Sequence, residues 1–277
     1  YENSPQLDFY GKGPDSSERD RTSYRLETAG FDLNAGYQLV RYVHAGVTGS
    51  FLSVHTGEGK RGGFPSTDES FDQGSAPGLL EDTHYFGVGG FLFLDFRDHP
   101  LGPRSGGLYG ARLRQFSDRE LEKFSFRQID WEAQQYFPYF NKTRVIALRA
   151  VATFSFENSG NTVPFYLQPK LGGNDSLRGF DRYRFYDKHA LLLSAEHRWH
   201  SFSGLDMAVF IDAGKVASRK ADMDFSELEV SAGFGFRFKL KESYFMRIDF
   251  AGGRENFRVM WTFSDIFKLK REGPLQF

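Results

Sequence analysis

Cysteine is absent from this 277-residue sequence, which excludes disulfide bonds and thiol chemistry. No sign of charge dominates either: the formal net charge at pH 7 is −1, so the composition does not point to nucleic acid as a partner. No uninterrupted apolar run reaches the ~18 residues that a membrane-spanning helix needs, which excludes a helical membrane protein. The chain also starts without a signal peptide, which indicates a mature chain or a fragment.

Aromatic residues, by contrast, are abundant. The sequence has 31 Phe and 13 Tyr, a load suited to lipid contact and to the aromatic girdles at a membrane surface. Charged residues still make up 26% of the chain. A spanning β-barrel accommodates both, since its strands alternate lipid-facing with lumen-facing residues and its average hydropathy resembles that of a soluble protein.

Alternation with a period of two residues indicates which side chains face lipid. Residues 225–240 place on one face the apolar side chains of Leu228, Val230, Ala232, Phe234, Phe236, Phe238 and Leu240. The next run places Tyr244, Met246, Ile248 and Phe250 opposite Arg247 and Asp249. Successive side chains of a strand point to opposite sides of the sheet. We therefore expect lipid to contact Phe234, Phe236, Phe238, Ile248 and Phe250, and the lumen to contain Arg237, Lys239, Arg247 and Asp249.

The same pattern predicts about eleven strands and no amphipathic helix of useful length. They cover residues 22–39, 43–55, 83–97, 107–117, 124–138, 143–156, 188–200, 204–216, 225–240, 243–252 and 256–266. A soluble β-sandwich also alternates, but its strands are usually about 3–10 residues long, and many of these are longer. The sequence thus predicts an all-β fold: an antiparallel transmembrane β-barrel in a single domain spanning 1–277. Because bacterial single-chain barrels have even strand numbers, either residues 5–11 supply a twelfth strand or strands before residue 1 are missing.

The predicted connections alternate in length. Short ones lie around 40–42, 139–142, 201–203 and 241–242, and long ones at 57–82, 157–187 and 217–224. The turn at 98–106 is the exception among the short set. Outer-membrane barrels have short periplasmic turns and longer extracellular loops. This alternation predicts a periplasmic C-terminus.

One loop motif resembles a known family. Leu177, Arg178, Gly179 and Phe180 form an aliphatic-Arg-Gly-aromatic tip. The tip is similar to the sixth extracellular loop of the bacterial surface-antigen superfamily, which includes BamA/TamA-like outer-membrane barrels and the two-partner secretion transporters. The resemblance implies that the tip folds back into the lumen and that Arg178 forms salt bridges with acidic residues on the two following strands. Glu196 and Asp212 lie on those strands.

Strand parity gives a separate reason to place both carboxylates in the lumen. On 188–200 the apolar face carries Leu191, Leu193, Ala195 and Trp199, so Glu196 belongs to the opposite face. On 204–216 the apolar face carries Leu205, Met207, Val209 and Ile211, which places Asp206 and Asp212 in the lumen. A guanidinium offers five donors in a planar fork and suits paired carboxylates in a confined site.

Two further segments extend the resemblance. The family's strand end and turn are similar to the segment containing Asp95, Arg97, Asp98 and Gly106, and its aromatic C-terminal strand signal is similar to the pattern of Phe257, Val259, Trp261, Phe263 and Phe267. Two features depart from the family: residues 268–277 continue as a tail, and the POTRA domains of BamA and TamA are absent. The chain is also too short for the usual sixteen strands, so the C-terminal part of a 16-stranded barrel is the second interpretation of the fold.

Enzyme motifs are missing: the sequence has no Gly-x-Ser-x-Gly elbow and no His-Glu-x-x-His. We expect no catalytic residues, no metal and no cofactor. The resemblance implies insertion or translocation of proteins at the bacterial outer membrane, with outer-membrane lipids and client outer-membrane or secreted polypeptides as partners. The alternative is a barrel-only passive pore, or a structural membrane anchor of a fused or partner domain. The client and the oligomeric state stay open.

Overall fold

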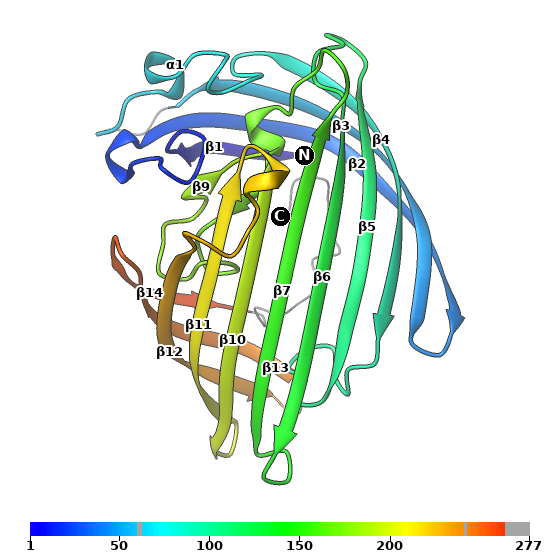
Figure 1. The fold of residues 1–277 in the computed structure, drawn as a ribbon, viewed down its shortest axis with the longest axis vertical. Coiled ribbons are helices and arrows are strands. Elements are labelled where there is room, and N and C mark those ends of the chain that lie inside the picture. The colour runs from blue at the N-terminus through cyan, green and yellow to red at the C-terminus, as the bar shows by residue number, and fades with distance from the viewer. Residues whose placement is uncertain (60–62, 241–242, 264–277) are drawn as a thin grey trace.

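Twelve strands form one antiparallel sheet in the computed structural model, which describes residues 1–59, 63–240 and 243–263 (Figure 1). Each strand pairs with the strands before and after it in this order. The strands are β1 (Glu2–Phe9), β2 (Thr22–Val40), β3 (Val43–Glu58), β4 (Asp82–Asp95), β5 (Gly106–Asp118), β6 (Phe126–Tyr139), β7 (Arg144–Glu157), β10 (His189–Phe202), β11 (Leu205–Ala217), β12 (Glu229–Leu240), β13 (Ser243–Gly252) and β14 (Phe257–Thr262). The predicted all-β, antiparallel architecture is therefore confirmed.

The remaining elements are short and lie in connections at one end of the sheet, here called the long-loop end. They are η1 (Glu18–Asp20), α1 (Thr67–Ser70), η2 (Phe165–Leu167), η3 (Lys220–Asp222) and a two-stranded sheet of β8 (Lys170–Leu171) with β9 (Phe185–Tyr186). The opposite, short-turn end carries the connections at 41–42, 96–105, 140–143 and 203–204. In the described part of the chain, every helix is too short to cross a membrane.

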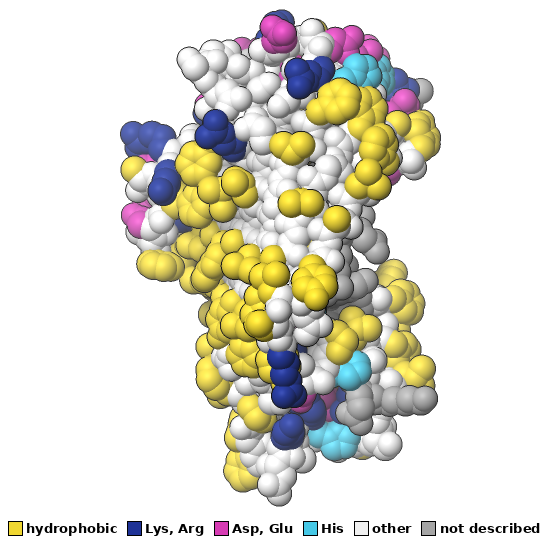
Figure 2. Space-filling view, turned by 90° about the vertical axis from the view of Figure 1, so that its right-hand side faces the viewer, with side chains coloured by type: hydrophobic (Ala, Val, Ile, Leu, Met, Phe, Trp, Pro, Cys, Tyr) yellow, Lys and Arg dark blue, Asp and Glu magenta, His cyan; other side chains and the backbone are white. Residues whose placement is uncertain are grey.

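The two faces of the sheet differ as the alternation predicts. On β12, Phe234 is 46% exposed, whereas Arg237 is 1% exposed. On β11, Ile211 faces outward and Asp212 is fully buried. Apolar side chains gather over the middle of the face shown in Figure 2, and charged side chains lie toward its upper and lower ends. This distribution is that of an apolar belt around a polar interior.

One predicted facing is wrong. Tyr244 points inward, where it is 3% exposed and its hydroxyl donates to Asp206 at 2.7 Å. The pairing of β12 with β13 shifts register between Phe238 and Lys239, and Phe245 is 46% exposed in place of Tyr244. Such a β-bulge adds one residue on one strand and reverses the parity beyond it.

Within the part of the chain that the structure describes, the two edges of the sheet do not pair with each other. The twelfth strand is β1, which covers 2–9 where 5–11 was expected, and its only strand partner among the described residues is the segment of β2 from Thr22 to Thr28. Residues 29–40 of β2 extend beyond β1, and all of them are exposed. In the described residues, β14 pairs with β13 alone. We call the space between the β1–β2 edge and β14 the seam.

The connection between β7 and β10 folds back inside the curved sheet (Figure 1). This segment, residues 158–188, is called the inner loop. Its η2 joins an aromatic core near the long-loop end, together with side chains from β1, β2, β4, β5 and β6. The core includes Phe9, Tyr24, Tyr85, Phe116, Phe126, Phe165, Tyr166 and Tyr186, all buried. The interior at this end is therefore packed with apolar side chains.

Candidate functional site

Two glycines with left-handed backbone conformations shape the tip of the inner loop. Gly172 and Gly173 have φ angles of +110° and +96°. The Gly173 N–H donates to the carbonyls of Leu177 and Phe180, at 3.2 and 3.1 Å. The chain thus doubles back on itself and presents residues 177–180 to the inner face of the sheet.

Arg178 extends from this tip to two carboxylates on neighbouring strands. Its Nε and one terminal nitrogen donate to the two oxygens of Asp212 on β11, at 2.7 and 2.8 Å. Its other terminal nitrogen donates to Glu196 on β10 at 2.9 Å. The guanidinium carbon lies 3.3 Å from the ring centroid of Phe210, a cation–π contact. The structure therefore brings together the three residues that the family motif and strand parity had singled out.

Glu196 is the centre of a larger charged cluster. It accepts hydrogen bonds from Arg198 at 2.8 Å and from Arg237 at 2.8 and 3.1 Å, in addition to that from Arg178. Arg237 also donates to Asp249 on β13 at 2.6 Å. The cluster therefore links the inner loop to β10, β11, β12 and β13.

Burial of this cluster decides its energetics. The side chains of Arg178, Glu196 and Asp212 are all 0% exposed. Removing charges from water is costly, and only close, well-directed pairing offsets that cost. The cluster is consequently weak evidence for added stability but strong evidence for a fixed position of the loop, because breaking one pair leaves a buried charge without its partner.

The other motif residues pack closely around this arginine. Leu177 and Phe180 are fully buried, and Phe180 contacts Phe185 edge-on with ring centroids 5.2 Å apart. A Cβ added to Gly179 would lie 2.6 Å from backbone atoms of Gly252 and Gly253. Glycine is therefore needed at position 179 because the backbone of the β13–β14 connection approaches closely.

A second part of the inner loop bridges the seam. Arg184 donates to the carbonyl and hydroxyl of Ser16, which follows β1, at 2.6 and 2.9 Å. The same guanidinium pairs with Glu255, between β13 and β14, at 2.9 Å. Asp181 accepts a hydrogen bond from Tyr10 at 3.2 Å and pairs with Arg258 of β14. Side chains of the loop therefore hold the two edges together where the described strands do not pair.

The predicted turn motif folds at the short-turn end. Arg97 forms a two-pronged pair with Asp95 at 2.7 and 2.9 Å. Asp98 accepts from the backbone N–H groups of Arg104 and Ser105, at 2.9 and 3.1 Å. Gly106 has a φ of +90°, and a Cβ there would lie 2.2 Å from a backbone oxygen. The turn is thus longer than the other short ones because it forms its own hydrogen-bonded unit.

This turn also reaches the C-terminal strands through Asp206. Arg104 donates to that carboxylate at 2.9 Å. Lys239 of β12 pairs with it at 2.8 Å, and His200 of β10 contacts it at 3.0 Å. Strand parity placed Asp206 in the lumen, but nothing in the local sequence identified it as the meeting point of these elements.

The residues of the C-terminal strand signal point outward. Phe257, Val259, Trp261 and Phe263 are between 52% and 74% exposed. Phe267 and residues 268–277 lie outside the described residues.

Several contacts of the site could not be predicted from the sequence. Arg237 and Asp249 were expected in the lumen, yet their convergence on Glu196 depends on the stagger between strands, which alternation does not reveal. The contact of Arg184 with Ser16 joins residues 168 positions apart. The described residues also contain no group of three or more side chains arranged to hold a metal ion.

Comparison with known proteins was made for both sequence and structure. The family described as the Omp85 superfamily domain matches residues 2–252. BamA from Haemophilus ducreyi lacking POTRA domains 1–3 is similar in structure, with a TM-score of 0.67 and 15% identity over 93% of this chain and 57% of that one. No curated protein sequence matches.

Two structures of CdiB are also similar. CdiB from Acinetobacter baumannii has a TM-score of 0.58 and 12% identity, over 91% of this chain and 44% of that one. CdiB from Escherichia coli has a TM-score of 0.57 and 17% identity, over 87% and 45%. The chain thus spans about half the length of the solved structures that it matches. At these identities the likeness concerns the fold.

Proposed function

The chain belongs to the Omp85 superfamily of outer-membrane barrels, and from that premise we propose that it inserts or translocates polypeptides at the bacterial outer membrane, with the seam as the place where a client strand pairs. On this proposal residues 1–277 form one barrel domain, and the short-turn end and the C-terminus face the periplasm. Its partners are outer-membrane lipids and the client polypeptide. The chemistry is strand pairing, with no catalytic step.

The unpaired edges are the observation that carries the proposal. Twelve residues of β2, 29–40, have strand geometry, and among residues 1–59, 63–240 and 243–263 they pair with β3 alone. In lipid, backbone N–H and C=O groups without partners cost several kcal/mol each, so an open edge in the membrane favours pairing with another strand. An extended peptide that adds to such an edge gains backbone hydrogen bonds irrespective of its sequence. That suits an assembly factor with many clients.

The buried cluster around Arg178 gives the other half of the proposed mechanism. It ties the inner loop to β10, β11, β12 and β13, a wall of neighbouring strands that ends beside β14 on one side of the seam. The ion pair of Asp181 with Arg258 at the seam is partly accessible, and the seam contacts are a few side-chain pairs and not a continuous strand ladder, although the Arg184 guanidinium itself is buried. In this proposal the wall stays fixed while the seam opens.

The aromatic core near the long-loop end counts against a passive pore. Strand and loop side chains pack there without exposure, including Phe9, Phe126, Phe165 and Tyr166. A permanently open channel needs a polar, water-filled interior along its length. The role of membrane anchor for a fused or partner domain remains the alternative.

A cross-link across the seam tests this function. Because the sequence has no cysteine, the reagent reacts only with the thiols that are introduced. The Asn256 amide donates to Glu18 at 2.7 Å across the seam. The Glu18→Cys/Asn256→Cys variant is joined by a short bis-maleimide and placed in lipid vesicles. Insertion of a small unfolded outer-membrane barrel is then followed by protease protection. We expect the unjoined variant to insert the barrel faster than empty vesicles do, and the joined protein to insert it no faster than empty vesicles.

The matched control joins two strands of the wall instead. Leu193 and Ala213 are paired across β10 and β11, so a Leu193→Cys/Ala213→Cys link leaves the seam free. This variant is expected to remain active. Equal activity of the seam-linked and wall-linked proteins, or no acceleration by any of them, contradicts the proposed function.

A further inference from the structure

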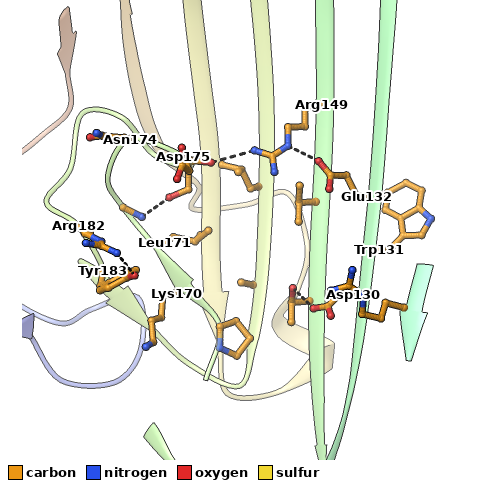
Figure 3. A pocket seen from close by; sticks show the side chains of 18 of the residues that line it. Asp130, Trp131, Glu132, Arg149, Lys170, Leu171, Asn174, Asp175, Arg182 and Tyr183 are labelled. Atoms are coloured by element: carbon orange, nitrogen blue, oxygen red, sulfur yellow. Dashed lines mark hydrogen bonds and ion pairs between the residues drawn. The ribbon is translucent and has the colours of Figure 1, made fainter. Parts of the chain in front are cut away.

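A cavity of about 430 Å³ lies inside the barrel, between the inner loop and the inner faces of β5, β6 and β7. Figure 3 shows the loop residues Lys170 and Arg182 on one side and the strand residues Asp130 and Glu132 on the other. The cavity extends to Arg258 on β14. Arg178, Glu196 and Asp212 do not line it, so it is separate from the buried cluster.

Positive charge dominates the cavity wall. The cationic side chains that line it are Arg112, Arg114, Arg149, Lys170, Arg182 and Arg258, and the carboxylates are Asp130, Glu132 and Asp175. Three of the cations have close anionic partners: Arg114 pairs with Asp130 at 2.7 Å, Arg149 with Glu132 at 2.8 Å, and Arg258 with Asp181. Arg112, Lys170 and Arg182 form no ion pair with any described residue.

The three remaining cations are crowded by like charges. Arg112 lies two residues from Arg114 on the same inner face of β5, and the carboxylates of Asp130 and Glu132 on β6 act on it without forming an ion pair. The Lys170 amine lies 5.0 Å, and the Arg182 guanidinium carbon 4.5 Å, from the ring centroid of Tyr183. The nearness of two cations around one ring is unfavourable unless an anion compensates them.

The pKa of Lys170 also indicates an excess of positive charge around it. Lys170 belongs to the inner loop, outside the spanning strands. Burial and, to a smaller extent, the charge of Arg182 lower its pKa, Glu2 opposes them, and the pKa lies at about 7. Near neutral pH its ammonium form therefore needs an additional negative charge nearby.

We propose that this cavity binds a compact phosphate-bearing anion, held by Arg112 on the barrel wall and by Lys170 and Arg182 on the inner loop. Three cations without an ion pair to a described residue match a ligand with two or more negative charges, and one phosphate monoester carries about −1.5 to −2 at neutral pH. Guanidinium groups bind phosphate with two parallel hydrogen bonds. The cavity wall also includes Phe93, Leu171 and Leu192, which suit an organic part of the ligand. The site does not depend on polypeptide insertion.

Binding of inorganic pyrophosphate tests the site. The full chain in a neutral detergent is titrated by calorimetry at constant ionic strength, with sodium chloride as the reference salt. We expect saturable binding that weakens by about tenfold in Arg112→Gln and in Arg182→Gln, the loss of one charged contact of roughly 1.4 kcal/mol in each. Lys220→Gln removes one positive charge from an exposed position outside the cavity and is expected to bind as the wild type does.

The folding of each variant is checked by its unfolding temperature without ligand. Arg182 is exposed at the cavity mouth, so Arg182→Gln is expected to fold normally. If Arg112→Gln fails to fold, Arg182→Gln still tests the site. Pyrophosphate should raise the unfolding temperature of the wild type, because a ligand that binds only the folded state stabilises it. The increase should be smaller in Arg182→Gln.

Lipid vesicles distinguish the source of the phosphate. If a lipid headgroup occupies the site, vesicles of phosphatidylcholine with phosphatidylglycerol will reduce pyrophosphate binding relative to phosphatidylcholine alone. If a free phosphate compound occupies it, both vesicles will give the same affinity. Binding no stronger than that of chloride, or equal binding by wild type and Arg182→Gln, overturns the proposal. An acidic peptide that binds more tightly than pyrophosphate through the same three cations replaces it with a polypeptide site.

Discussion

The buried negative charge of Asp212 is paired with a single side chain, that of Arg178. Arg178 donates the side-chain hydrogen bonds to both oxygens of Asp212. Glu196, by contrast, also accepts hydrogen bonds from Arg198 and Arg237. We predict that Arg178→Met lowers the free energy of unfolding by about 3–5 kcal/mol, since Asp212 then remains buried without a cation. Urea unfolding in lipid vesicles measures this loss.

A double variant separates the broken pair from lost packing. Arg178→Met combined with Asp212→Leu removes both charges, and it should recover a large part of the stability because no buried charge is left alone. A loss below about 1 kcal/mol in the single variant would indicate an exposed pair and contradict the buried geometry.

Gly179 offers a prediction about space. A Cβ at this position meets backbone atoms of Gly252 and Gly253 at 2.6 Å, and those atoms cannot rotate away. Gly179→Ala should therefore cost roughly 1–3 kcal/mol through overpacking. Gly49 on β3 is the matched control, because a Cβ there meets no atom within 4 Å. Similar unfolding midpoints for Gly179→Ala and Gly49→Ala would show that the loop tip is not packed against the β13–β14 connection.

At the scale of elements, the turn at 96–105 makes a prediction about pH. Burial raises the pKa of Asp98, but hydrogen bonds from the backbone N–H groups of Arg104 and Ser105 and from the Ser105 hydroxyl outweigh it, so the pKa lies below its ordinary value of 3.8. A lowered folded-state pKa stabilises the folded state above pH 3.8, and the contribution disappears as pH falls through the folded-state value.

We therefore predict that Asp98→Asn costs about 1 kcal/mol at neutral pH, a modest value because the side chain is partly exposed. The difference from the wild type should shrink in unfolding measurements carried out below the ordinary pKa of the carboxyl. Asp222→Asn is the control, since that carboxylate pairs with Arg219 in the exposed η3 and should contribute little. A constant difference across this pH range contradicts the role given to the ionised carboxylate.

The strands could be predicted because their signal is local. Whether a strand residue is apolar or charged indicates which face of the sheet it lies on. The alternation in 225–240 was therefore enough to place Phe234 outside and Arg237 inside. Tyr244 was misplaced because a bulge is set by the partner strand, which a single strand's sequence does not contain. The first strand was predicted only as one of two alternatives, since its pairing with β2 is interrupted between Ser4 and Leu7.

The candidate site was partly within reach for the same reason. Parity placed Glu196 and Asp212 in the lumen, and the family motif suggested that Arg178 meets them. The bridge from Ser16 through Arg184 to Glu255 had no such signal, because it joins three segments that are distant in the sequence. Contacts of this kind follow from how the sheet curves, which depends on all twelve strands together.

At the scale of the whole molecule, two requirements act on the same sheet. The outer face has to be apolar along the height of the membrane, and the inner face has to hold buried charges in register with the inner loop. One strand meets both: β12 directs Phe234 and Phe236 outward and Arg237 toward Glu196 and Asp249. A register slip of one residue would expose the arginine to lipid and break the cluster at once.

The last prediction tests the apolar belt at Phe236, near the middle of β12. Arg in place of a lipid-facing residue at the bilayer midplane costs about 2–4 kcal/mol, and the cost falls to about 0–1 kcal/mol near the membrane surface. Phe236→Arg should therefore lower the free energy of unfolding in vesicles by about 2–4 kcal/mol beyond Phe236→Leu. The leucine variant removes the edge-on ring contacts with Phe234 and Phe250, both at 6.3 Å, without adding charge. Phe225→Arg changes an exposed residue of the connection between β11 and β12, where we expect little loss. If Phe236→Arg and Phe225→Arg destabilise equally, the middle of β12 does not contact lipid, and the outward face of the sheet has a different partner.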